Sequence, residues 1–130
     1  MSHTLFLLFN HRFTDLQRED ARKSLGVDHI VELPHDLQAI WSSLPPDEPE
    51  LAPVLGPIRS WLTSAAEPGD FVLIQGDFGA CYLMVRFCLE HGLIPIYSTT
   101  ERHAQEEAQP DGSIRLMHTF QHRIFRRYGR

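Results

Sequence analysis

A glycine-flanked loop between an apolar strand and a helix constrains the fold of this chain most. Phe71–Ile74 is an apolar run of strand length, and Ala80–His91 carries apolar residues at helical spacing. The loop between them, Gln75–Gly79, has glycine at positions 76 and 79. Glycine lets backbone N–H groups approach an anion at the positive end of a helix dipole. The pattern predicts a strand–loop–helix unit with either a ligand-binding loop or a plain tight turn.

Apolar runs and helical patterns alternate along most of the chain. We predict strands at Thr4–Phe9, His29–Leu33, Phe71–Ile74 and Ile94–Tyr97, and helices at Thr14–Leu25, Asp36–Ser43, Pro57–Ala66 and Ala80–His91. The proline-rich segment 44–53 is predicted to be a surface linker. Such an alternation favours a single α/β domain over residues 1–130, with three layers and a right-handed, mainly parallel sheet of order 2-1-3-4.

The C-terminal third of the chain gives two conflicting signals. Pro110–Ser113 contains an Asp-Gly pair, which is typical of hairpin turns, and residues 114–124 alternate apolar and polar side chains. Glu101–Gln109, before the turn, is rich in Ala, Gln and Glu and favours helix on propensity alone. We predict an antiparallel hairpin that extends the sheet at its C-terminal end.

Polar residues follow three of the predicted strands. They are Asn10-His11 after the first strand, Gln75–Gly79 after the third and Ser98–Arg102 after the fourth. Ligands bind at the carboxyl ends of strands in open α/β sheets, where the strand order reverses. With the order 2-1-3-4 that point lies between the first and third strands. We therefore expect the three segments to form one site.

The side chains at these strand ends suit phosphate chemistry. His11 could hold a phosphate or move a proton, or it could be an ordinary solvated loop histidine. Thr99, Thr100 and Arg102 offer two hydroxyls and a guanidinium, the donors that a phosphodiester needs in transfer. The alternative for Thr100 is a helix N-cap, with Arg102 on the surface.

Several classes of site lack their sequence signatures. The first strand ends in Phe9-Asn10-His11-Arg12 without a dinucleotide-binding glycine motif, and Lys23, the only lysine, is not in a phosphate-binding loop. No fingerprint of an acyl-transfer or redox enzyme is present. His118 and His122 fall on a predicted strand without Cys or Asp at ligand spacing. We expect no metal and no cofactor.

The charge distribution limits the partners. Residues 115–130 hold five arginines and no acid, whereas residues 1–114 hold seven basic and 17 acidic side chains. A diffuse basic surface for long nucleic acid is absent, although the tail could touch a small polyanion. Apolar runs are too short to span a bilayer, and the N-terminus has no signal-peptide pattern, so a cytoplasmic protein without membrane contact is expected.

Several multi-residue segments together resemble a small CRISPR-associated family. They are Leu5–His11, Thr14-x-x-Gln17, Leu33-Pro34, Leu37-Gln38-x-x-Trp41-Ser42, Gln75–Gly79, Tyr97–Thr100 with Arg102, and Phe120-x-His122-x-x-Phe125-Arg126-x-Tyr128. The family belongs with the stand-alone ring nucleases of type III systems. Ser98 stands where the family pattern has alanine. The resemblance implies a dimeric Rossmann-like domain that binds cyclic oligoadenylate, most often cyclic tetra-adenylate, and cleaves it, which switches off the effectors that this messenger activates.

Cleavage is expected to be metal-independent, because each RNA linkage carries a 2′-hydroxyl that can attack its own phosphate. The products would be linear oligoadenylates ending in 2′,3′-cyclic phosphate. We predict His11, Arg102 and Thr100 as catalytic residues, and as ligand-binding residues Asn10, Gln75, Gly76, Phe78, Gly79, Thr99 and His122. A homodimer would share one pocket between the carboxyl edges of its two sheets. The competing hypothesis is a module that binds the ring without cleaving it.

Overall fold

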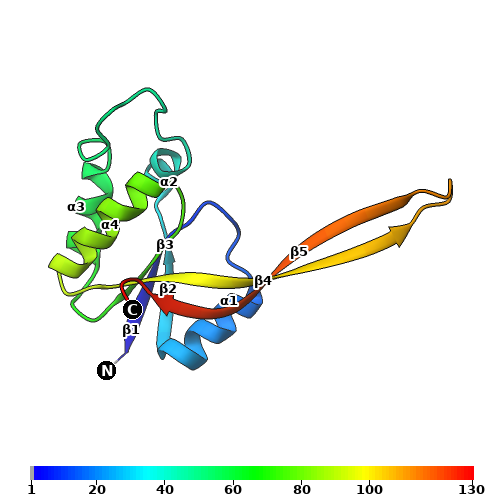
Figure 1. Cartoon of the computed structure of the whole chain (residues 1–130). Helices are drawn as coiled ribbons and strands as arrows, with labels where there is room; N and C mark the ends of the chain where they lie inside the picture. Colours follow the sequence, from blue (N-terminus) through cyan, green and yellow to red (C-terminus); the bar gives the residue numbers. More distant parts are fainter. Residues whose placement is uncertain (1) are drawn as a thin grey trace.

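The computed structural model describes residues 2–130, which form a mixed α/β fold (Figure 1). The strands are β1 (His3–Leu8), β2 (Val27–Glu32), β3 (Phe71–Ile74), β4 (Ile94–Ala108) and β5 (Ile114–Arg127). The helices are α1 (Asp15–Asp20), the π-helical turn η1 (Ala21–Leu25), α2 (His35–Ser42), α3 (Gly56–Ala65) and α4 (Phe78–Glu90). The alternation predicted from the sequence is confirmed for residues 3–97. Within residues 2–130, no helix is long and apolar enough to cross a membrane.

The sheet has five strands in the order β2-β1-β3-β4-β5. β1 pairs in parallel with β2 and β3, and β3 pairs in parallel with β4, whereas β4 and β5 are antiparallel. The first four strands follow the predicted order 2-1-3-4, and β5 adds a fifth, antiparallel strand beside β4, so the order of the whole sheet goes beyond the predicted one. β4 was expected to end at Tyr97, but it continues to Ala108 and pairs with β5 along its length.

The antiparallel hairpin is confirmed, and its first arm is a strand rather than a helix. Residues 101–108 pair with residues 114–121 of β5, so cross-strand hydrogen bonds prevail over the helix propensity of this arm. Figure 1 shows the hairpin reaching far from the rest of the molecule, and its side chains over residues 100–108 and 114–121 are exposed. We call residues 100–122 the ribbon.

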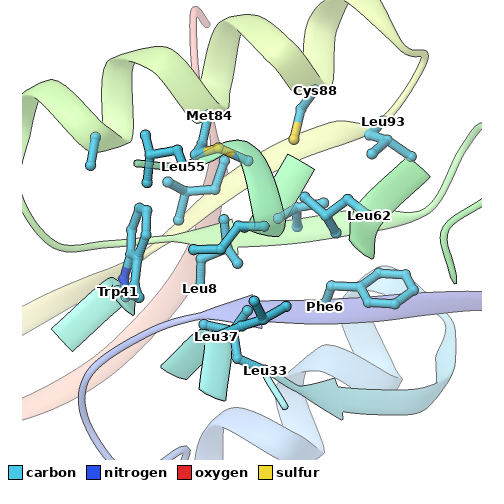
Figure 2. Close-up of a cluster of buried hydrophobic side chains, with 14 residues drawn as sticks. Phe6, Leu8, Leu33, Leu37, Trp41, Leu55, Leu62, Met84, Cys88 and Leu93 are labelled. Atoms are coloured by element: carbon cyan, nitrogen blue, oxygen red, sulfur yellow. The ribbon is translucent and has the colours of Figure 1, made fainter. Parts of the chain in front are cut away.

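Side chains from alternate positions of the sheet fill two cores. Phe6 and Leu8 of β1 point into the larger core, which α2, α3 and α4 cover (Figure 2). Leu5 and Leu7 point to the opposite face, where Phe13, which precedes α1, and Ala21 of η1 help to complete the smaller core. The sheet thus lies between two helical layers, which gives it one face toward α4 and one toward α1.

The segment on the second face begins and ends as the sequence predicts. Thr14 caps α1 by accepting a hydrogen bond from the Gln17 backbone N–H, and the Gln17 side chain accepts from the Thr14 backbone N–H. The segment ends at Gly26, whose φ of 68° lies in the left-handed region that glycine adopts without strain.

Candidate functional site at the carboxyl edge of the sheet

The ends of three parallel strands meet around Gln75. Its backbone N–H donates to the Leu8 carbonyl at the end of β1 over 3.0 Å. Its side-chain Oε1 accepts from the Ser98 backbone N–H on β4 over 2.7 Å. Trp41 Nε1 of α2 donates to the Gln75 carbonyl over 3.1 Å. The predicted convergence of the strand ends, with β1 beside β3, is confirmed.

An aromatic cleft of about 530 Å³ opens next to this junction. Its lining residues are Gln75, Gly76, Phe78, Cys81, Tyr82, Val85, Tyr97 and Tyr128. Phe78, the first residue of α4, is 95% exposed, so its ring stands in solvent at the mouth of the cleft. Solvent exposure of a whole phenyl ring is costly unless a ligand or partner covers it. The cleft is the best candidate for a ligand site.

One wall of the cleft comes from the C-terminus of the chain. The Tyr128 ring lies 4.8 Å from the Tyr97 ring, and its hydroxyl donates to the Ile74 carbonyl over 2.5 Å. Arg126 Nη1 donates to the Tyr97 hydroxyl over 3.0 Å, and its guanidinium carbon lies 5.6 Å from the centre of that ring. Sequence reasoning missed these three residues, as well as Tyr82, as site residues. The interleaving of aromatic residues and arginines near the C-terminus was the available signal.

Two ionisable groups of the cleft, Tyr128 and Cys81, are held in their neutral forms by a raised pKa. Burial, followed by the proximity of Cys81 and Tyr97, raises the pKa of Tyr128 to about 12. Burial also raises the pKa of the Cys81 thiol, and the carboxylate of Asp77 adds to this effect. Cys81 is therefore not a thiolate nucleophile, and the cleft offers neutral walls with Arg126 as a cation beside them.

The backbone donors of the glycine loop at the start of α4 are already used within the chain. Asp77 is the N-cap of α4, and its Oδ1 accepts from the backbone N–H groups of Gly79 and Ala80 at 3.2 and 3.3 Å. The carboxylate occupies the donors that a phosphate would use, and its charge repels an anion. Of the two alternatives that the sequence leaves open, the capping aspartate favours the plain tight turn at this helix end.

Gly76 is needed for close packing against Trp41. A Cβ at this position would lie 3.1 Å from Trp41 Nε1 and 3.2 Å from Cε2, closer than side chains normally approach. We expect Gly76→Ala to lower the free energy of unfolding by about 1–3 kcal/mol in urea titrations. Gly79→Ala is the matched control. Its Cβ would meet Asp77 and Leu51 at ordinary distances, so it should be neutral or slightly stabilising. Equal destabilisation by both changes would contradict this packing argument.

Asn10 and His11 lie on the other side of the Gln75–Gly79 loop from the aromatic cleft. Asn10 Oδ1 accepts from Ser42 Oγ over 2.9 Å and from Gln38 Nε2 over 3.3 Å. Asn10 and Asp77 help to line a second, more polar cleft of about 360 Å³. The His11 side chain is exposed and packs against the Phe9 ring at 5.5 Å.

The predicted residues of β4 divide between the two faces of the sheet. Thr99, like Tyr97, faces the α4 side, and its hydroxyl exchanges hydrogen bonds with the backbone of Ile124 at 3.1 and 3.2 Å, filling a bulge. Thr100 and Arg102 alternate with them and point to the α1 side. Arg102 Nε donates to the His118 ring over 3.1 Å. Thr100 and Arg102 therefore do not line the aromatic cleft of their own subunit. The alternative that Thr100 caps a helix was wrong, because Thr100 lies within strand β4.

His122 is buried in a polar network under the base of the ribbon. Its Nε2 donates to Asp20 Oδ2 over 2.7 Å, and its Nδ1 shares a 2.5 Å hydrogen bond with Ser98 Oγ. Gln17 Nε2 donates to the same hydroxyl over 3.4 Å. The network ties α1 to β4 and β5. Ser98, which stands where the ring nucleases that the sequence resembles have alanine, is thus a structural partner of His122.

The state of Asp20 should make this network sensitive to acid. Burial would raise the pKa of Asp20, but hydrogen bonds from Ser24 and His122 and the charges of His122 and Lys23 outweigh it. The folded-state pKa therefore lies below the ordinary value of 3.8. The stabilisation is present above that value and is lost as pH falls through the folded-state pKa.

We expect Asp20→Asn to cost about 1 kcal/mol of unfolding free energy at pH 6, since the carboxylate is partly exposed. The difference from the parent should shrink as pH falls below 3.8, the ordinary carboxyl value. Denaturant titrations across this range measure both effects, with Glu19→Gln as an exposed neighbouring control. A difference that stays constant down to pH 2 would show that the charge of Asp20 contributes nothing.

Comparison with known sequences places the chain in a family. Residues 3–126 match the family described as "Uncharacterized protein MJ1673 family". The chain belongs to this family. A curated relative, "Uncharacterized protein MJ1673" from Methanocaldococcus jannaschii, is 50% identical over 124 residues, which is 95% of each chain. No solved structure matches significantly. The similarity thus spans the strand-end loops, the cleft as far as Arg126 and the whole ribbon.

Proposed function

We propose that this protein is a ring nuclease that cleaves cyclic oligoadenylate, with cyclic tetra-adenylate as the preferred ring and type III CRISPR signalling as its setting in the cytoplasm. The observation that carries the proposal is the aromatic cleft beside the carboxyl ends of β1, β3 and β4. In a Rossmann-like domain this edge is where nucleotides bind. The sequence segments that resemble ring nucleases contribute the Gln75–Gly79 loop, Tyr97 and Tyr128 to the cleft.

The cleft has the size and chemistry of an adenine site. Its volume of about 530 Å³ suits a nucleotide-sized ligand, and Phe78 and Tyr82 present aromatic faces for stacking. The side-chain Oε1 of Gln75 accepts from the Ser98 backbone N–H, so its Nε2 would donate to a ring nitrogen of adenine. Arg126, beside Tyr97, would face the phosphate that follows the base.

Catalysis would rely on positioning the substrate's own 2′-hydroxyl. The protein would hold the 2′-oxygen, phosphorus and leaving 5′-oxygen in line and stabilise the charge that develops. We assign proton donation to His11 and charge compensation to Arg126. Arg126 replaces Arg102 in this role because it flanks the cleft, whereas Arg102 and Thr100 face the α1 side. Asn10 would contact the substrate from the neighbouring polar cleft.

A homodimer would match the symmetry of the substrate. A tetra-adenylate ring has approximate two-fold symmetry, and two copies of the carboxyl edge related by a dyad would present two equivalent clefts to it. Each subunit would then stack one adenine on Phe78 and hold one scissile phosphate.

Incubation of the protein with cyclic tetra-adenylate in excess EDTA, followed by chromatography of the nucleotide, tests the proposal. A ring nuclease of this kind converts the ring to shorter linear products without added metal. A module that only binds the messenger returns the ring intact, and it would still show saturable binding. Cleavage that appears only after addition of a divalent metal would overturn the metal-independent mechanism.

A further inference from the structure

The ribbon exposes an apolar face that nothing in its own subunit covers. Each residue of β4 and the β5 residue opposite it place their side chains on the same face, and we call such a pair a row. Successive rows alternate between the two faces of the ribbon. One face carries Ile114, Leu116 and Phe120, which are 66%, 57% and 68% exposed. The opposite face is mainly polar, with the pairs Glu107–Arg115 and His103–Thr119, although Met117 opposite Gln105 is also exposed there. A two-stranded ribbon is at best marginally stable in water by itself, so the apolar face needs a partner.

The apolar face has a charge pattern that complements itself. Its rows are Thr100–His122, Arg102–Phe120, Ala104–His118, Glu106–Leu116 and Ala108–Ile114. A two-fold axis across the Ala104–His118 row reverses this order in the second copy. Arg102 then meets Glu106 of the partner subunit, and Phe120 meets Leu116 of the partner subunit. Each opposite-charge contact and each apolar contact occurs twice, as an isologous interface requires.

The tip of the ribbon also finds a matching surface in this arrangement. Ile114 comes to lie over the row of the partner subunit's His122, beside a cleft of about 220 Å³ lined by Leu16, Glu19, Asp20, Lys23, His122 and Arg123. Leu16 in that cleft is 45% exposed. Glu106, near the end of the ribbon, approaches the basic side chains Arg22 and Lys23 of the partner subunit's η1 turn. In this arrangement the apolar side chain of Ile114 lies near that of Leu16 of the partner subunit, and an acidic side chain lies near basic ones.

We infer that the ribbon is a dimerisation arm that packs, through its apolar face, against the ribbon and α1 face of a second copy of this chain. β4 runs parallel to β1 and β3, so the arm leaves the body beyond the carboxyl edge (Figure 1). Antiparallel packing of two arms turns the two carboxyl edges toward each other. The two Thr100–His122 rows are then eight residues apart, about 26 Å at a strand rise of about 3.3 Å. This inference does not depend on the nuclease activity.

Charge reversal tests the arm by size-exclusion chromatography with light scattering. Arg102→Glu places two Glu–Glu contacts in the dimer, and Glu106→Arg places two Arg–Arg contacts, so each single variant should weaken dimerisation by roughly 10- to 100-fold. An equimolar mixture of the two variants restores both opposite-charge contacts in a heterodimer, and the double variant restores them in a homodimer. Within one chain the two side chains are about 13 Å apart along β4, so rescue in the mixture reports contacts between subunits.

A cysteine at the axis provides a second measurement. His118 faces its own copy across the dyad, so His118→Cys should form a disulfide-linked dimer under mild oxidation. His103→Cys, on the opposite face of the same ribbon, is the control and should remain uncrosslinked. The parent protein on the same gel accounts for Cys81 and Cys88. A parent protein that is monomeric at micromolar concentration, or charge variants that dimerise as well as the parent, would overturn the inference. A dimer without the predicted crosslink would overturn the register.

Discussion

Phe78→Ala is expected to weaken binding of cyclic tetra-adenylate by roughly 10- to 100-fold, because stacking of one base on an aromatic ring contributes about 1–3 kcal/mol. The ring of Phe78 is 95% exposed at the mouth of the aromatic cleft. Its removal should therefore leave the free energy of unfolding almost unchanged. Fluorescence or calorimetric titration with the ring measures the affinity, and single-turnover cleavage at saturating protein should stay within several-fold of the parent.

Leu89→Ala is the matched control for Phe78→Ala. Leu89 is an exposed apolar residue of the same helix, α4, but it lies toward the opposite end and outside the aromatic cleft. Its loss should not change affinity for the ring. Equal weakening by the two variants would mean that the loss of exposed apolar surface, rather than stacking in the cleft, causes the effect.

His11→Ala is expected to slow single-turnover cleavage by roughly 10²–10³-fold while affinity for the ring stays within several-fold. The imidazole would protonate the leaving 5′-oxygen or donate to a non-bridging phosphate oxygen, both of which matter most in the transition state. Because His11 is exposed and its ring lies against that of Phe9 at the surface, its removal should not unfold the protein. Rapid-quench measurements with protein in excess give the rate.

His29→Ala provides the control for His11→Ala. His29 is an exposed histidine of β2 that pairs with Thr4, near the amino end of β1, so it lies at the other edge of the sheet. The His29→Ala variant should cleave cyclic tetra-adenylate at the parental rate. If His11→Ala also cleaves at that rate, the proton donor lies elsewhere, and our assignment of His11 is wrong.

The parallel part of the fold could be predicted because local and long-range signals agree there. Buried strands such as Phe71–Ile74 are continuous apolar runs, and the helices that follow carry apolar residues at helical spacing. The length of β4 could not be predicted in the same way. Its second half is polar and favours helix, and it is held as a strand by pairing with β5, whose contribution is not visible in the segment itself.

The candidate site was predicted at the level of strand ends but not of side-chain direction. Gln75 does join the ends of β1, β3 and β4, as the alternation of strands and helices implies. Thr100 and Arg102, however, point to the opposite face from Tyr97, since a shift of an odd number of residues along a strand changes the face. Tyr128 reaches the cleft only because β5 returns alongside β4, a contact between distant residues that no local pattern reveals.

The most direct test of the proposed mechanism compares natural cyclic tetra-adenylate with a ring in which every 2′-hydroxyl is O-methylated. Both rings offer the same adenines and phosphates, so they should bind with affinities within several-fold of each other. In excess EDTA we predict that mass spectrometry finds linear products ending in 2′,3′-cyclic phosphate from the natural ring, and only intact ring from the methylated one. Cleavage of the methylated ring at the natural rate, or a natural ring that binds and is returned whole, would contradict the account.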